Sequence, residues 1–234
     1  MPAESVQPDS GDGARAVFFD LDGTLVDTAL DMVRVLQDLQ RDRGMAPLDY
    51  GLGRSHVSNG AAGLIRLAFP ELGEADRHAL LREFLDRYAA RVCEFSTTFD
   101  GIDALLAGLE AARVPWGVVT NKPAALTDAL LSALGLSERA ACAVSGDTLE
   151  VRKPHPGPLL LACELAGSRP ERSIYVGDAG RDIEAGNAAG MATIAVRYGY
   201  IVAGDDPARW GAAEIAANPA ELTQIVRKAV NLDA

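Results

Sequence analysis

The sequence predicts an α/β protein, with a doubly wound parallel sheet and an inserted helical cap domain. An apolar run at residues 16–19 breaks into carboxylates and a glycine, as a buried parallel strand does where it meets a loop. The following stretch, residues 28–97, shows only helical periodicity. From residue 98 onward helices and strands alternate, which is typical of a parallel sheet with helices on both faces.

The first strand, residues 16–19, should take the central place in the sheet. A helix should follow from Thr28, and Gly44 offers its stop because glycine readily adopts the left-handed conformation that ends helices. Two more helices should come after a polar loop. The apolar side chains at helical spacing in these three segments are, in order, Leu30, Val33, Leu36 and Leu39; Ala61, Leu64, Ile65, Ala68 and Phe69; and Leu81, Phe84, Leu85, Tyr88 and Val92.

Helical and strand-like segments alternate along the rest of the chain. They are the helix 102–109, the strand-like PWGVVT (115–120), the helix 126–134, the short ACAVS (141–145), the helix 159–165, and the strands SIYVGD (173–178) and ATIAV (192–196). Since such sheets bind ligands at the carboxyl ends of their strands, the helical insertion should sit above that edge. We therefore expect a core domain of residues 15–27 and 98–234, a cap domain of residues 28–97, and a disordered polar tail at residues 1–14.

The composition limits the partners of the chain. It has 234 residues, 48% of them hydrophobic, which is enough for one large domain with an insertion or for two modest domains. The net charge of -11 and the pI of about 4.7 argue against nucleic acid and anionic membrane surfaces as partners. No apolar run reaches the roughly 18 residues of a membrane span. No secretory signal is visible, so we expect a cytoplasmic protein.

Two carboxylates stand at the exit of the first strand. Asp20 and Asp22 are two positions apart, so their side chains can lean into one pocket, while Gly23 lets the chain turn tightly. Mg²⁺ would offset their repulsion because it prefers carboxylate oxygens. An Asp-Gly pair by itself is more often an ordinary turn, so this pair alone does not establish a site.

Polar residues follow later segments of the predicted core. Thr120 ends the PWGVVT strand, where its hydroxyl either caps the next helix or donates to a phosphate oxygen, and Asn121 follows it. Lys153 lies in VRKPHPGP, where a lysine is ordinarily a solvated loop residue. Next to two aspartates, however, it would neutralise them and hold a phosphoryl group. We interpret its neighbours Arg152 and His155 as surface residues.

A fourth stretch, GDAGRDIEAGNAAGM at residues 177–191, follows the strand SIYV. Asp178 and Asp182 are four positions apart on one face of a starting helix, next to glycines that allow close backbone approach. Helix capping is the other explanation for Asp178. Four such stretches occur along one chain, so separate turn and capping explanations would all have to coincide. This coincidence argues against those explanations and favours one shared site.

Together the four stretches resemble the four signatures of the haloacid dehalogenase (HAD) superfamily, the first of them being DLDGTLVDT at residues 20–28. The resemblance covers residues 15–222 and implies a Rossmann-like core with an aspartyl-phosphate mechanism. It implies that Asp20 is the nucleophile. It also implies that Asp22 protonates the leaving alcohol and later activates water.

For the other residues the resemblance implies contacts with phosphate and metal. The implied phosphate-binding residues are Thr120, Asn121 and Lys153, and the implied Mg²⁺-binding residues are Asp20, Asp22, Asp178 and Asp182. Asp178 would bind the ion directly, whereas Asp182 would bind it through water or pair with Lys153. Thr24 would shape the first loop. Asp27 and Thr28 would either mark the hinge into the cap or cap the next helix.

Within the superfamily the resemblance is closest to phosphoglycolate phosphatase-like members. Several strings also resemble N-acetylmuramic acid 6-phosphate phosphatases, which act in bacterial cell-wall recycling: RDRG (41–44), SNGA (58–61), FLDRY (84–88), WGVVTNKP (116–123), YGYI (198–201) and WGA (210–212). The implied function is a Mg²⁺-dependent phosphomonoesterase that acts on 2-phosphoglycolate or N-acetylmuramic acid 6-phosphate, as a monomer or homodimer. A sugar phosphomutase of the β-phosphoglucomutase type shares every catalytic signature and is the alternative.

The loop at residues 55–60 is the expected source of specificity, because a cap loop can reach the leaving group. Ser58 and Asn59 offer hydroxyl and amide contacts to a hydroxylated substrate, although an ordinary helix entrance explains them equally well. Tyr198 and Tyr200 either border the pocket or pack in the core.

Overall fold

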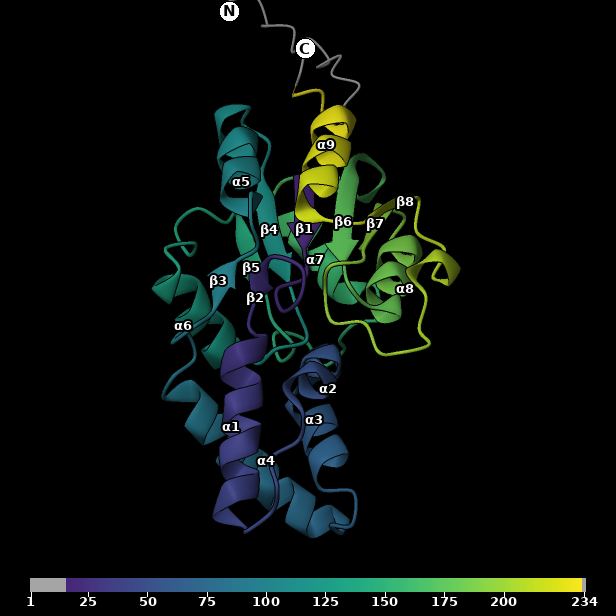
Figure 1. Ribbon diagram of the computed structural model, residues 1–234. Coiled ribbons are helices and arrows are strands. Elements are labelled where there is room, and N and C mark those ends of the chain that lie inside the picture. Colours follow the sequence, from purple (N-terminus) through teal and green to yellow (C-terminus); the bar gives the residue numbers. More distant parts are fainter. Residues whose placement is uncertain (1–15, 233–234) are drawn as a thin grey trace, which may run out of the picture.

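A six-stranded parallel sheet forms the centre of the protein (Figure 1). The computed structural model describes residues 16–232. The strand order is β5-β4-β1-β6-β7-β8. The bounds are β1 Ala16–Phe19, β4 Trp116–Val119, β5 Cys142–Val144, β6 Ser173–Gly177, β7 Ala192–Val196 and β8 Glu214–Ala216. The predicted α/β class is confirmed, while the tail predicted at residues 1–14 lies outside the described residues.

The strand order switches beside β1, which is a central strand as the sequence predicts. From β1 the sheet continues through β4 to β5 on one side, and through β6, β7 and β8 on the other. Phe19 is level with Val118 of β4 and with Val176 of β6, so these three strands end at one edge. A switch in strand order opens a crevice at the carboxyl ends of the strands, where such sheets bind ligands.

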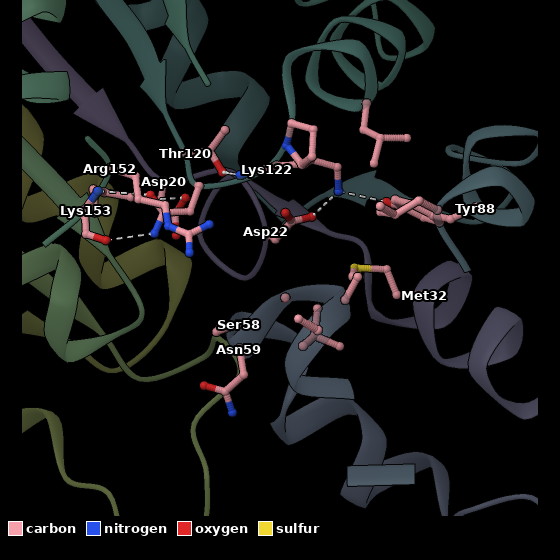
Figure 2. Close-up of a pocket in the computed structure, with 18 of the residues that line it drawn as sticks. Asp20, Asp22, Met32, Ser58, Asn59, Tyr88, Thr120, Lys122, Arg152 and Lys153 are labelled. Carbon is pink, nitrogen blue, oxygen red and sulfur yellow. Dashed lines mark hydrogen bonds and ion pairs between the residues drawn. The ribbon is translucent and has the colours of Figure 1, made fainter. Parts of the chain in front are cut away.

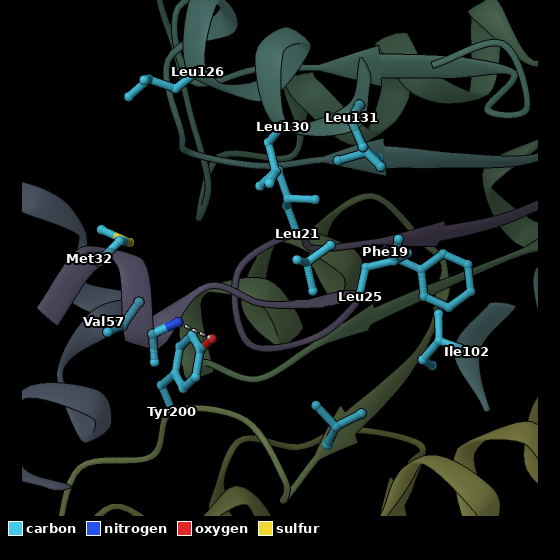
Figure 3. Packing of buried hydrophobic residues seen from close by; sticks show 14 of the residues in the cluster. Phe19, Leu21, Leu25, Met32, Val57, Ile102, Leu126, Leu130, Leu131 and Tyr200 are labelled. Atoms are coloured by element: carbon cyan, nitrogen blue, oxygen red, sulfur yellow. Dashed lines mark hydrogen bonds between the residues drawn. The ribbon is translucent and has the colours of Figure 1, made fainter. Parts of the chain in front are cut away.

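Helices cover both faces of the sheet. On one face lie α7 (Gly157–Leu165) and α8 (Gly180–Ala188), and on the other lie α5 (Ile102–Ala111), α6 (Ala124–Ala133) and α9 (Pro219–Ala229). Alternation along β1 explains the two layers, because Phe18 packs into one apolar cluster while Val17 and Phe19 pack into the other. Figure 3 shows Phe19, Leu21 and Leu25 within this second cluster.

A group of helices stands off the carboxyl end of the sheet, and its members pack on each other (Figure 1). This helical block consists of α1 Ala29–Asp42, α2 Tyr50–Ser55, the short 3-10 helix η1 Val57–Asn59, α3 Gly60–Ala68 and α4 Glu74–Ala89. The three helices predicted in this stretch are confirmed as α1, α3 and α4. The short α2 escapes the prediction because its sequence, YGLGRS, contains two glycines and no apolar stripe.

Two chain segments connect the helical block to the sheet domain, and they run side by side. Val26–Asp27 (β2) pairs antiparallel with Thr97–Thr98 (β3). Nearby, the carboxylate of Asp31 accepts hydrogen bonds from the backbone N–H groups of Phe95 and Ser96 and from the Ser96 hydroxyl. The boundaries predicted for the insertion fall at this pair of strands.

The last strand and helix, β8 and α9, have no counterpart in the sequence prediction. Asn218 caps α9 by accepting from the Glu221 N–H, and the helix buries Leu222 and Val226. β8 is too short to show a strand period. Two further 3-10 turns are η2 Pro170–Arg172 and η3 Pro207–Arg209. Among the helices of the described chain, none combines the length and the apolar character that crossing a membrane requires.

Candidate active site

The turn after β1 brings Asp20 to the crevice and holds it there. Asp20 is buried, and its Oδ1 accepts a hydrogen bond of 2.8 Å from the backbone N–H of Leu21. Gly23 has a φ of 85°, and a Cβ atom at this position would lie 2.2 Å from Asp178 Oδ2. A side chain does not fit there, so the loop needs glycine to wrap around Asp178.

Lys153 supplies the positive charge next to Asp20 (Figure 2). Its Nζ lies 2.9 Å from Asp20 Oδ1 and 2.8 Å from Asp182 Oδ1. It also donates hydrogen bonds of 2.9 Å to the Val119 carbonyl and 2.7 Å to the Tyr175 hydroxyl. Four oxygen neighbours fix this buried ammonium in place, where it offsets the repulsion between the carboxylates. The prediction that this lysine stands beside aspartates is confirmed, and its contact with phosphate stays a prediction.

Three carboxylates meet at this edge of the sheet. Carboxylate oxygens of Asp20, Asp178 and Asp182 all lie within 4.8 Å of one another, and all three residues are buried. Burial, together with the charges of Asp20 and Asp182, raises the pKa of Asp178 to about 8. Burial also raises the pKa of Asp182, although Lys153 opposes that shift. A bound cation would therefore relieve the repulsion in this three-carboxylate cluster.

The three-carboxylate cluster fits Mg²⁺. Asp178 Oδ2 accepts hydrogen bonds of 2.7 Å from Ser58 Oγ and from the Tyr200 N–H. Asp178 Oδ1 is also buried, but it has no hydrogen-bond partner among residues 16–232. A buried carboxylate oxygen without a donor is costly unless a cation binds it. Because Mg²⁺ prefers carboxylate oxygens, this cluster is the group of residues that would hold it.

Magnesium is expected to stabilise the protein more at pH 8 than at about pH 5.5. The pKa of Asp178 is raised in the folded state, so in metal-free protein its contribution to stability is present below about pH 4 and is lost as the pH rises toward 8. Bound Mg²⁺ displaces the proton, so its stabilising effect grows over the same range. Melting temperatures measured with EDTA and with Mg²⁺ at both pH values test this. We expect the gain at pH 8 to be larger by about 4 °C or more, equivalent to about 1 kcal/mol for a chain of this size. Equal gains would argue against the site.

Asp22 lies apart from the three-carboxylate cluster and pairs with a lysine. Its Oδ1 is 2.9 Å from Lys122 Nζ and accepts a hydrogen bond of 2.6 Å from Thr28 Oγ1. This arrangement differs from the four-ligand metal set that the resemblance implies, which includes Asp22. Lys122 is a site residue that the sequence does not predict, although its position two residues after Thr120 indicates that it follows β4 at the same edge of the sheet.

Thr120 and Asn121 follow β4 directly and support the loops of the site. Thr120 is buried, and its Oγ1 accepts a hydrogen bond of 3.2 Å from the Lys122 N–H. The Asn121 side chain binds the Lys153 backbone twice, donating to its carbonyl at 2.9 Å and accepting from its N–H at 3.1 Å. Asn121 thus positions the lysine loop, whereas the phosphate contacts of both residues stay predictions.

The cap-loop residue Ser58 reaches the three-carboxylate cluster from the helical block. Its hydroxyl donates to Asp178 Oδ2 at 2.7 Å, and Arg181 donates to its carbonyl. Ser58 therefore has a partner within the protein, and its contact with a leaving group stays a prediction. Arg54 makes a second link, to the Gly199 carbonyl at 3.4 Å. The helical block is therefore seated on the crevice.

Tyr198 and Tyr200 anchor the loop that follows β7. Tyr200 Oη accepts hydrogen bonds of 2.6 and 3.0 Å from the N–H groups of Thr28 and Ala29, at the start of α1. Tyr198 Oη donates to the Thr24 carbonyl at 2.9 Å. Neither tyrosine lines the cavity of the site. Of the two alternatives left open for them, the structure favours packing.

A cavity of about 550 Å³ lies between the sheet domain and the helical block. Its floor is polar and includes Asn121 together with five residues that Figure 2 labels: Asp20, Asp22, Thr120, Lys122 and Lys153. Its wall from the helical block is largely apolar and includes Met32, Val57, Ala61, Leu81, Phe84 and Leu85. Ser58 and Asn59 also line it, as does Arg152, which is exposed, as the sequence predicts. A polar floor below an apolar wall suits an anionic ligand with a sizeable organic part.

Comparisons with known proteins agree with this geometry. A family model described as haloacid dehalogenase-like hydrolase matches residues 17–196. The N-acetylmuramic acid 6-phosphate phosphatase of Pseudomonas aeruginosa is 43% identical over 92% of this chain and 96% of its own length. A phosphoglycolate phosphatase of Xanthomonas campestris pv. campestris is 43% identical over 89% of this chain and 94% of its own. A crystal structure of a predicted phosphoglycolate phosphatase from Haemophilus somnus, 28% identical, superposes with a TM-score of 0.81 and covers 91% of this chain and 97% of that one.

Proposed function

The chain belongs to the haloacid dehalogenase-like hydrolase family and is a phosphoric monoester hydrolase, and we propose that Asp20 is its nucleophile. One observation supports this assignment above the others. Asp20 stands at the end of the central strand, 2.9 Å from a buried lysine and beside two further buried carboxylates. The proposed substrates are 2-phosphoglycolate and N-acetylmuramic acid 6-phosphate, after the names of the relatives that are 43% identical.

In the first step a carboxylate oxygen of Asp20 attacks phosphorus, and the ester P–O bond breaks. The leaving alcohol takes a proton from Asp22, and the phosphoryl group remains on Asp20 as an aspartyl phosphate. In the second step water attacks the phosphorus of the aspartyl phosphate and gives a proton to Asp22. The P–O bond to Asp20 breaks, so inorganic phosphate leaves and the Asp20 carboxylate is restored. Lys153 and Thr120 would stabilise the charge on the phosphoryl oxygens. Bound Mg²⁺ would let the carboxylate approach a phosphate dianion by offsetting their combined negative charge.

We assign residues 28–97 to a cap over a core formed by residues 15–27 and 98–234. Two features support this division: the helical block packs on itself, and its two connections meet in the β2–β3 pair. A cap seated on the crevice would exclude water during the first step. The cytoplasmic location and the monomeric or dimeric state stay predictions, and a role in cell-wall recycling depends on the muramyl substrate.

A panel of phosphorylated metabolites tests the proposed function. The purified protein would be assayed with Mg²⁺ against 2-phosphoglycolate, N-acetylmuramic acid 6-phosphate, hexose 1-phosphates and p-nitrophenyl phosphate, and kcat/KM would be compared. We expect phosphate release, with the highest kcat/KM for 2-phosphoglycolate or N-acetylmuramic acid 6-phosphate. Conversion of a hexose 1-phosphate to its 6-phosphate would favour the phosphomutase alternative. Full activity after EDTA treatment would contradict the metal assignment.

Replacement of Asn59 by Ala is expected to lower kcat/KM for the natural substrate by about 10-fold while changing that for p-nitrophenyl phosphate by less than about 2-fold. Asn59 lines the cavity on the side of the helical block, where an amide can bind the hydroxyl groups of a natural leaving group, whereas a nitrophenyl ring has no hydroxyl and offers only weak nitro acceptors. Steady-state kinetics with the two substrates measure this. The aryl ester serves as the internal control, and equal losses would contradict a role in specificity.

A further inference from the structure

A buried lysine links Asp22 to the helical block. The chain has three lysines, and two of them, Lys122 and Lys153, are buried at the site. Lys153 serves the three-carboxylate cluster, whereas the proposed mechanism leaves Lys122 unused. Lys122 Nζ lies 2.9 Å from Asp22 Oδ1 and donates a hydrogen bond of 2.9 Å to the hydroxyl of Tyr88 on α4 (Figure 2). We propose that Lys122 and Tyr88 are positioning residues that aim the Asp22 carboxylate at the substrate.

The hydrogen bonds of Asp22 show how this positioning works. Lys122 Nζ and Thr28 Oγ1 both bind Oδ1, at 2.9 and 2.6 Å. Oδ2 has no donor in the part of the chain that the structure describes, and Asp22 lines the cavity. Two anchors on one oxygen fix the plane of the carboxylate. Oδ2 is therefore the oxygen left to exchange a proton with the leaving alcohol and with water.

Tyr88 makes this positioning depend on the helical block. Besides the hydrogen bond from Nζ, the ammonium of Lys122 lies 4.7 Å from the centre of the Tyr88 ring. A buried ammonium is stable only where its partners compensate for lost hydration, and here one partner comes from the sheet domain and the other from α4. Burial lowers the pKa of Lys122, but Asp22 and Tyr88 outweigh this effect and raise it above its ordinary value. The lysine thus stays charged while the helical block is seated.

The alternative roles of Lys122 predict different kinetics. If Lys122 bound the phosphoryl group directly, its loss would slow the reaction of every phosphate ester equally. If it only stabilised the fold, its loss would lower the melting temperature without selecting among substrates. If Lys122 positions Asp22, its loss lowers kcat/KM mainly for esters whose leaving group needs a proton. This inference rests on the proposed function, because it takes Asp22 as the acid and base.

The test compares an alkyl ester with an aryl ester. An alkoxide needs a proton as it leaves, whereas p-nitrophenolate leaves without one. We expect Lys122→Met to lower kcat/KM by about 10²-fold for the better of the two proposed substrates, and by about 10-fold or less for p-nitrophenyl phosphate. Tyr88→Phe removes one hydroxyl and should show the same preference with a smaller loss, about 5-fold on the alkyl ester. Lys228→Met and Tyr50→Phe, at exposed positions, are the matched controls.

A double-mutant cycle decides whether Tyr88 acts through Asp22. In an Asp22→Asn background, adding Tyr88→Phe should leave the residual rate unchanged within about 2-fold. Equal losses on both esters, or full additivity with Asp22→Asn, would overturn the inference. The inference would also be overturned if Tyr88→Phe had no effect while Asp22→Asn was inactive. Full activity of Asp22→Asn itself would instead overturn the acid and base role in the proposed function. If Lys122→Met does not fold, Tyr88→Phe alone gives the same comparisons.

Discussion

Asp20→Asn is expected to lower kcat for every phosphate monoester by about 10⁴-fold or more. The amide nitrogen and oxygen of asparagine do not form the acyl phosphate on which the proposed mechanism depends. The fold should persist, because the remaining Oδ1 still accepts from the Leu21 N–H and from Lys153 Nζ. The substitution also removes one negative charge from the three-carboxylate cluster, which lowers the repulsion there.

Phosphate release with the natural substrate and with p-nitrophenyl phosphate measures the loss, and thermal unfolding checks the fold. Mass spectrometry after an acid quench should find one phosphoryl group on the Asp20 peptide of the wild type and none on that of the variant. Asp128→Asn, the same chemical change at an exposed position on α6, is the matched control. A rate for Asp20→Asn within about 10-fold of the wild type would refute the nucleophile assignment.

Lys153→Met is expected to lower both activity and stability. Methionine has a similar length but no charge, so Asp20 and Asp182 lose the ammonium that lies 2.9 and 2.8 Å from them. Removing one partner of a buried ion pair costs about 3–5 kcal/mol in the free energy of unfolding. The loss of charge stabilisation on the transferring phosphoryl group should lower kcat/KM by about 10³-fold.

Denaturant unfolding in EDTA and steady-state kinetics with Mg²⁺ separate these two effects. Lys228 lies on the exposed side of α9, away from the site. Lys228→Met should therefore change neither the free energy of unfolding nor kcat/KM. An unfolding free energy for Lys153→Met that equals the wild-type value would show that Lys153 does not stabilise the carboxylates. Unchanged kcat/KM would show that it does not contact the phosphoryl group.

The strands and longer helices of the fold were predictable because their signals are local. The apolar run of β1 ends where Asp20 begins the loop, and the stripes of α1, α3 and α4 have the helical period. Short elements escaped the prediction for the same reason. Six residues of α2 with two glycines show no period, and the pairing of β2 with β3 joins segments about 70 positions apart.

The candidate site was only partly predictable from the sequence. Parallel strands bring their carboxyl ends to one edge, so Asp20 after β1, Thr120 after β4 and Asp178 after β6 could be placed there in advance. The partners of these side chains could not be predicted from the sequence. Asp22 pairs with Lys122 from 100 positions away, and Ser58 reaches Asp178 across 120 positions.

By itself the sequence determined which residues stand at the ends of the strands, because hydrophobic period and turn chemistry depend on near neighbours. Only the tertiary structure decided which charges face each other. It separated Asp22 from the three-carboxylate cluster and turned Ser58 toward a carboxylate. The physical reason is that a buried charge is stable only with compensating partners. Here those partners come from distant segments, brought together by the strand order and by the seating of the helical block.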